Sequence, residues 1–304
     1  MWNAIKQNRW WIYQQERFPV FAHGTLIAVF SLAAVAYSAV LGGRYALELS
    51  AFAVAFATTF GFFLLLRIAD EFKDFEDDCR YRAYRPVPRG LIGLNDLRYL
   101  AIIVLALQML AALLLHAPLA MLLVLVWVYL GLMTVEFFAG SWLRRHPTPY
   151  MLSHMLIMPL IQLYASACDW LPQTSTPPAG LSWFLAASYA NGLVIEIGRK
   201  IRVPEDEEPG VETYSVLWGR KTACLVWLSA MGAAGVFASL AADRVAVGGL
   251  TIVLLSLGWI ISALLAFHFL TQTRTQSGKA IETCSGLWTL ASYLLLGPVA
   301  LLMV

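Results

Sequence analysis

Long apolar stretches alternate with short polar segments along almost the whole chain. Nine of these stretches come close to the roughly 20 residues that an α-helix needs to cross a bilayer. The pattern therefore predicts an all-α integral membrane protein with nine transmembrane helices. The expected helices cover Phe18–Leu41, Tyr45–Phe75, Leu97–Leu115, Leu119–Phe138, Tyr150–Cys168, Leu181–Gly198, Thr222–Ala242, Val247–Leu270 and Ile281–Val304.

The composition supports a membrane protein and excludes several other classes. Of the 304 residues, 60% are hydrophobic and 13% are charged, whereas a soluble domain averages about 25% charged residues. The net charge of +2 gives no reason to expect a nucleic-acid partner. The four cysteines stand far apart, without the spacing that is typical of a zinc site or a disulfide framework.

We expect one nine-helix domain over residues 18–304, preceded by a separate segment over residues 1–17. This segment mixes aromatic and basic residues, which suits either an interfacial helix in contact with membrane lipid or an aromatic belt before the first span. A proline-containing linker over residues 169–180 divides the domain into halves at about 18–168 and 181–304. Charged segments follow the second and the sixth expected helix, so the halves are predicted to be a pseudo-repeat.

The distribution of basic residues predicts the orientation in the membrane. With the amino terminus in the cytoplasm, Arg44 and Arg244 fall on the outer side and Arg67 falls within a span, while all other Lys and Arg residues fall on the inner side. Cytoplasmic loops of membrane proteins carry such an excess of basic residues. We therefore expect a protein of the cytoplasmic membrane whose amino terminus and charged loops are cytoplasmic, with the carboxyl terminus on the opposite side.

Three aspartates, Asp70, Asp74 and Asp78, stand at every fourth position where the second span ends. On an α-helix each step of four residues adds roughly 40° of rotation and about 6 Å of rise, so the three carboxylates line one face. The carboxyl end of a helix disfavours anions, so this row favours a bound cation. Mg²⁺ binds one or two carboxylates together with substrate phosphate oxygens. We expect the three aspartates to be metal ligands, with Glu71 in the same or an outer shell; the alternative is a solvated helix end.

A basic loop, Arg80–Gly90, follows these aspartates directly. A guanidinium group binds two phosphate oxygens at once. Arg85 and Arg89 are therefore the expected diphosphate ligands, whereas Arg80 and Arg82 are expected to be membrane-surface charges. The acidic row and the basic loop together predict a site for Mg²⁺ and a diphosphate.

The chain resembles the UbiA superfamily of intramembrane prenyltransferases over essentially its whole length. The first motif of that family has an Asn and two Asp at every fourth position, then Arg-Pro and a Gly. Here it is matched by Asp70, Asp74, Asp78, Arg85-Pro86 and Arg89-Gly90, with Asp in place of the leading Asn. The resemblance implies nine helices around a central membrane-embedded pocket, with cytoplasmic loops over that pocket.

The second family motif is matched less well. The family has two Asp four residues apart on helix 6, whereas this chain has Glu196 and Lys200, followed by the segment Gly210–Ser215. An ammonium group has no lone pair and cannot ligate a metal. A second Mg²⁺ is therefore either absent or held by Glu196 with Glu205 or Glu208. Arg199, Lys200 and Arg202 form either a basic clamp for the diphosphate or an ordinary positive-inside cluster.

The resemblance implies an enzyme that ionises an isoprenoid diphosphate with Mg²⁺ and transfers the prenyl group to a lipophilic, aromatic acceptor. Asp70, Asp74, Asp78 and Glu196 are then the catalytic set. The alternative is a terpene cyclase of the same superfamily, in which the ionised prenyl chain closes on itself. A transporter is disfavoured because its charges lie near the membrane midplane, whereas these acids cluster at one surface.

Three further polar residues lie in or near the apolar stretches. We expect Glu136 to pair with Arg144 or Arg145 at the end of its helix. His154 and Gln162 flank Pro159, and they either contact an acceptor hydroxyl or satisfy backbone groups that the proline leaves free.

Overall fold

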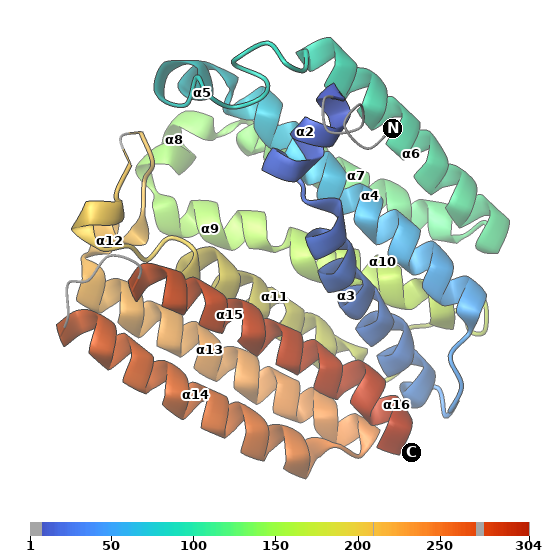
Figure 1. Ribbon diagram of the computed structural model, residues 1–304. Coiled ribbons are helices and arrows are strands. Elements are labelled where there is room, and N and C mark those ends of the chain that lie inside the picture. The colour runs from blue at the N-terminus through green and yellow to red at the C-terminus, as the bar shows by residue number, and fades with distance from the viewer. Residues whose placement is uncertain (1–7, 209, 272–276, 304) are drawn as a thin grey trace.

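The computed structural model describes residues 8–208, 210–271 and 277–303, and within these ranges the chain is all-helical (Figure 1). The helices are α2 (Arg9–Arg17), α3 (Val20–Leu41), α4 (Leu49–Lys73), α5 (Phe75–Tyr81), α6 (Leu94–Leu115), α7 (Leu119–Thr134), η1 (Glu136–Phe138), α8 (Gly140–Arg145), α9 (Pro147–Met155), α10 (Ile157–Trp170), α11 (Leu181–Gly198), η2 (Pro204–Asp206), α12 (Tyr214–Trp218), α13 (Arg220–Ala242), η3 (Asp243–Val245), α14 (Gly248–Thr271), α15 (Ser277–Leu294), η4 (Leu295–Val299) and α16 (Ala300–Met303).

Each predicted span corresponds to one helix or to two or three consecutive helices; Val304, the end of the last span, lies outside the described residues. Within the described ranges, seven helical segments are long and apolar enough to cross a membrane. The two remaining spans correspond to α7, which has 16 residues, and to α11, which has 18 residues and matches the predicted bounds. The all-α membrane fold is confirmed, and the number of nine crossings stays a prediction.

Two predicted spans are interrupted at their prolines. The fifth span is split into α9 and α10 at Leu156, and Pro159 lies in the first turn of α10, where its missing N–H is tolerated. The last span contains a π-helical turn, η4, around Pro298. A Cβ added to Gly297 in this turn would come within 2.3 Å of Ala33 Cα, so the turn packs directly on the backbone of α3.

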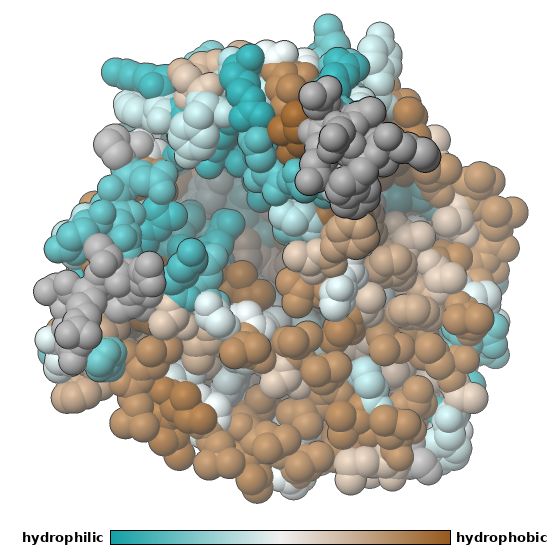
Figure 2. Space-filling model, in the orientation of Figure 1, coloured by the Kyte–Doolittle hydropathy of each residue, from teal (hydrophilic) through white to brown (hydrophobic). Residues whose placement is uncertain are grey.

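The polar elements collect at one end of the bundle. Figure 1 shows α5, α8 and α12 near this end and α16 at the opposite end. In Figure 2 the same end is mostly hydrophilic, whereas hydrophobic residues cover most of the visible remainder. We call this the polar end; its assignment to the cytoplasmic side stays a prediction.

Helix α2 is tied to the polar end by ion pairs. Arg17 pairs with Glu71 on α4 at 2.5 Å, and only 1% of the Glu71 side chain is exposed. Arg9 pairs with Asp96 on α6 at 3.0 Å, and both of these side chains are more exposed. The segment before the first span therefore includes a helix that packs on the protein, while its expected contact with lipid headgroups is untested.

We predict that replacing Arg17 by Met destabilises the protein, because it leaves the Glu71 carboxylate buried without its partner. Breaking a buried ion pair in this way costs about 3–5 kcal/mol. The thermal unfolding midpoint of the purified protein in detergent should fall, and Arg17→Met/Glu71→Met should recover much of the loss. Arg9→Met is the matched control, because an exposed pair contributes about 0–1 kcal/mol. Equal midpoints for the two single variants would contradict the prediction.

Candidate functional site

The three aspartates lie where α4 passes into α5. Helix α4 ends at Lys73 and α5 begins at Phe75, but the backbone hydrogen bonds continue across the junction. The Asp74 N–H donates to the Asp70 carbonyl at 2.9 Å, and the Asp78 N–H donates to the Asp74 carbonyl at 2.8 Å. The expected helical spacing of the three residues is therefore kept across a short break in the helix.

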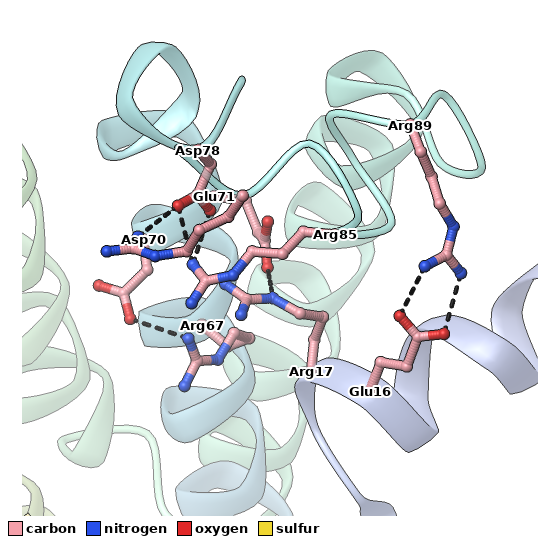
Figure 3. Close-up of polar contacts among 9 residues, drawn as sticks. Glu16, Arg17, Arg67, Asp70, Glu71, Asp78, Arg85 and Arg89 are labelled. Atoms are coloured by element: carbon pink, nitrogen blue, oxygen red, sulfur yellow. Dashed lines mark hydrogen bonds and ion pairs between the residues drawn. The ribbon is translucent and has the colours of Figure 1, made fainter. Parts of the chain in front are cut away.

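The three carboxylates differ in their partners. Asp78 is almost fully buried and pairs with Arg82 at 2.6 Å and with Arg85 at 2.7 Å (Figure 3). The Asp70 side chain is 52% exposed and makes a looser pair with Arg67 at 3.4 Å. Asp74 has no hydrogen-bond or ion-pair partner among the side chains of the described residues. Asp74 is thus the carboxylate that is available to a ligand.

The environment of Asp74 disfavours its negative charge. Burial raises the pKa of the Asp74 carboxyl above its usual range, and the nearby Asp70 carboxylate raises it further. Asp78 acts in the same direction, while Lys73 and Arg82 oppose it in part. A bound cation between Asp70 and Asp74 would relieve this repulsion.

The end of α11 carries the second acidic motif. The Glu196 side chain is only 7% exposed, and both of its carboxylate oxygens are engaged. Arg199 pairs with one oxygen at 2.5 Å and Lys200 with the other at 3.0 Å. The following loop folds back on this helix end, since the Tyr214 N–H donates to the Lys200 carbonyl at 3.0 Å.

The two motifs face each other at the polar end. The Arg82 side chain donates to the Gly210 carbonyl at 3.2 Å, so the loop after α5 touches the loop after α11. The pKa of Arg199 is raised mainly by Glu196 and to a smaller extent by Asp70, so the Asp70 charge at the end of α4 acts on a side chain at the end of α11. Figure 2 shows a hollow with hydrophilic walls on this face, between these two regions.

Several predicted site residues have other partners. Arg89 makes two hydrogen bonds to Glu16 on α2, both at 2.9 Å, and lies apart from the aspartates in Figure 3. Glu71 pairs with Arg17, as described above. The other predicted residues lie on the segment after α11 and line a pocket of about 440 Å³ together with Arg199 and Lys279. These residues are Arg202, Glu205 and Glu208. Arg202 pairs there with Glu208 at 3.3 Å.

Arg82 is a site residue that the sequence did not identify. It was expected to be a membrane-surface charge, but its side chain is only 12% exposed and contacts Asp78. Its position four residues after Asp78 is the spacing at which opposite charges meet on a helix. That spacing is the signal that would have placed Arg82 in the site.

A second group that the sequence did not identify lies beside Asp74. The Lys73 ammonium donates to the Tyr150 hydroxyl at 2.5 Å and pairs with Glu136 at 3.0 Å. The expected pair of Glu136 with Arg144 or Arg145 is therefore wrong. Glu136, Phe137 and Phe138 have φ angles of 49°, 52° and 58°, and three consecutive left-handed residues are strained unless surrounding contacts hold them.

His154 and Gln162 do not satisfy the backbone around Pro159. The His154 ring stacks on Tyr150 with centroids 3.9 Å apart, and its Nδ1 lies 2.8 Å from the Tyr150 carbonyl. The Gln162 amide donates to the Phe30 carbonyl at 3.5 Å, across to α3. Contact of either residue with an acceptor stays a prediction.

The residues at α4 fit one Mg²⁺. Asp70 and Asp74 lie one helical turn apart, and Asp74 has no competing partner among the described side chains. Within the described part of the chain, no group of three or more His, Cys, Asp or Glu side chains is clustered as a complete metal site. Mg²⁺ does not require such a group, because it usually takes one or two carboxylates and completes its shell with water and phosphate oxygens.

We predict that Asp74 of the metal-free protein protonates at a higher pH than an ordinary aspartate, whose pKa is about 3.9. Burial and the Asp70 charge both favour the neutral carboxyl. Infrared difference spectra between the wild type and Asp74→Asn, recorded in a chelator across a pH series, would give the midpoint. A midpoint at or below about 3.9 would contradict the described environment.

A model of the UbiA prenyltransferase family matches residues 27–290, while no curated protein sequence gives a significant match. The apo structure of a UbiA homolog from Aeropyrum pernix K1 superposes with a TM-score of 0.67 at 18% identity, over 91% of this chain and 97% of that one. A digeranylgeranylglyceryl phosphate synthase superposes with a TM-score of 0.59 at 13% identity, over 97% of this chain and 99% of the other. These structures share the fold, and the family model covers most of the sequence. The chain therefore belongs to the UbiA prenyltransferase family.

Proposed function

We propose that this protein is a Mg²⁺-dependent prenyltransferase that binds an isoprenoid diphosphate at the polar end and transfers its prenyl group to a lipophilic, aromatic acceptor. The main support is that the end of α4, with α5 and its loop, lies against the loop that follows α11. The α4 end offers the unpaired Asp74 carboxylate beside arginines, and the α11 end offers Arg199 and Lys200. This combination suits a metal-bound polyanion.

The basic side chains would bind and orient the diphosphate. Arg85 and Arg82 are already fixed by Asp78, so their guanidinium groups require little ordering when an anion arrives. Arg199 contacts Glu196 through Nε and Nη2, and its half-exposed guanidinium group can present its remaining N–H groups to the diphosphate from the other side. Hydrogen bonds from guanidinium to phosphate are charge-assisted and stronger than neutral ones.

Asp70 and Asp74 would hold the Mg²⁺. When bound, Mg²⁺ acts as a Lewis acid that stabilises negative charge on the leaving diphosphate. Arg89 was predicted to be a diphosphate ligand, but its pair with Glu16 suits a role in fixing the loop to α2. On this account the diphosphate contacts come from Arg82, Arg85, Arg199 and Lys200.

Prenyl transfer at this site would break the bond between the allylic carbon and the diphosphate oxygen, and the electron pair would leave with the diphosphate. The acceptor would then supply an electron pair to the allylic carbon and lose a proton. Aromatic faces can stabilise the allylic cation. Phe137 and Tyr129 are candidates, since their rings meet edge to face with centroids 5.5 Å apart near the Lys73 group.

The test is incubation of the purified protein with geranyl, farnesyl or geranylgeranyl diphosphate and Mg²⁺, first without an acceptor and then with lipophilic phenols. We expect consumption of one of these diphosphates and a prenylated product that requires the phenol. Cyclic hydrocarbon or alcohol formed without an acceptor would replace the proposal by a terpene cyclase. No consumption under any of these conditions would overturn both.

We predict that Asp74→Ala lowers the rate of diphosphate release by at least about 100-fold, because the metal loses its unpaired ligand. Asp77→Ala is the matched control, since Asp77 is exposed on α5 and next to the acidic row in sequence. It should keep nearly all activity. Both variants should unfold close to the wild-type temperature, and more than half of the activity in Asp74→Ala would contradict the metal role.

A further inference from the structure

The Glu196 carboxylate is already neutralised by two cations from its own chain. Arg199 and Lys200 lie three and four residues further along, and each pairs with a different carboxylate oxygen. A metal ion at Glu196 would have to displace one of them and would be repelled by the other. Asp74 is in the opposite situation, because no described side chain pairs with it.

The position of the Lys200 ammonium is fixed by more than Glu196. The Tyr214 N–H donates to the Lys200 carbonyl at 3.0 Å, and the Tyr214 ring lies under the ammonium, with the centroid 5.5 Å from Nζ. Tyr214 itself is buried at the start of α12 and stacks on Trp218. The Lys200 side chain nevertheless keeps 29% of its surface exposed, so it can still contact a ligand.

In the part of the chain that the structure describes, the surroundings of Glu196 hold no group of three or more His, Cys, Asp or Glu side chains that could bind a metal ion. Glu205 and Glu208, the two acids that were expected to help, lie on the exposed loop. Among the described residues, Glu208 pairs with Arg202, and no hydrogen bond or ion pair joins Glu205 or Glu208 to Glu196. Of the four motif carboxylates, Asp70, Asp74, Asp78 and Glu196, Asp74 is therefore the one without a cation partner within the described ranges.

We propose that Lys200 is a built-in replacement for a second metal ion. Its ammonium supplies a fixed positive charge to the diphosphate at the α11 end, and the site takes one divalent cation, at Asp70 and Asp74. This inference rests on the proposed function, because it assumes that the polar end binds a metal diphosphate. The proposal also gives Glu196 a role although both of its carboxylate oxygens are already paired: the carboxylate positions the Lys200 ammonium.

The first test is the number of metal ions bound. The probe is Mn²⁺, counted by electron paramagnetic resonance, with geranylgeranyl thiolodiphosphate as an analogue that resists ionisation. We expect one Mn²⁺ per wild-type chain and none at this site in Asp74→Ala. Two ions per wild-type chain would overturn the role of Lys200 while leaving the proposed function in place. No bound Mn²⁺ in the wild type would instead count against the proposed function itself.

Two substitutions separate the charge of Lys200 from its bulk. Lys200→Asp adds a carboxylate four residues after Glu196, and we expect a second Mn²⁺ to bind. Lys200→Met keeps the length of the side chain without its charge, so the count should stay at one while the analogue binds about tenfold more weakly, a loss of about 1.4 kcal/mol. One ion in Lys200→Asp, or unchanged analogue affinity in Lys200→Met, would overturn the proposal. Thermal unfolding of each variant checks that it is folded.

Discussion

The structure depends on the pairing of charges at the polar end of an otherwise apolar bundle. A buried charge without a partner costs several kcal/mol, so each buried carboxylate there has a cation beside it. Asp78 is held by Arg82 and Arg85, Glu71 by Arg17, and Glu196 by Arg199 and Lys200. The first two pairings tie the loop after α5 to α5 and helix α2 to α4, the pairs of Glu196 stay within the end of α11, and Arg82 also reaches the loop after α11 through the Gly210 carbonyl. Asp74 is the exception, and its unpaired charge marks the place where a ligand would complete the arrangement.

The same pairing explains features that are remote from the aspartates in sequence. Glu136 reaches Lys73 from a turn with three left-handed residues, and the ion pair helps to hold that strained turn in place. The Lys73 ammonium also orients Tyr150, on which His154 stacks. Lys73, Glu136, Tyr150 and His154 therefore form a connected group at the polar end, so a substitution at one of them should alter the positions of the others.

The spans and the aspartate row could be predicted from the sequence because each depends on local spacing. Apolar runs of membrane length identified the helices, and the fourfold spacing of Asp70, Asp74 and Asp78 survived the break between α4 and α5. The partners could not be predicted where they come from distant segments, as for Glu71 with Arg17 or Lys73 with Tyr150. The contact of Arg82 with Asp78 was not predicted although the two residues are only four positions apart, because a basic residue at a helix end also fits the positive-inside pattern. The different roles of Arg85 and Arg89 depend on where α2 packs, which spacing alone does not specify.

The most direct test of this account is a structure with Mn²⁺ and a thiolodiphosphate analogue, in which anomalous scattering locates the metal. The account predicts a Mn²⁺ peak between Asp70 and Asp74, with the diphosphate group between that ion and Arg85, Arg199 and Lys200. A metal peak at Glu196 without one at Asp74 would contradict it. So would an analogue bound at the opposite end of the bundle, near the pair of Arg44 with Asp169.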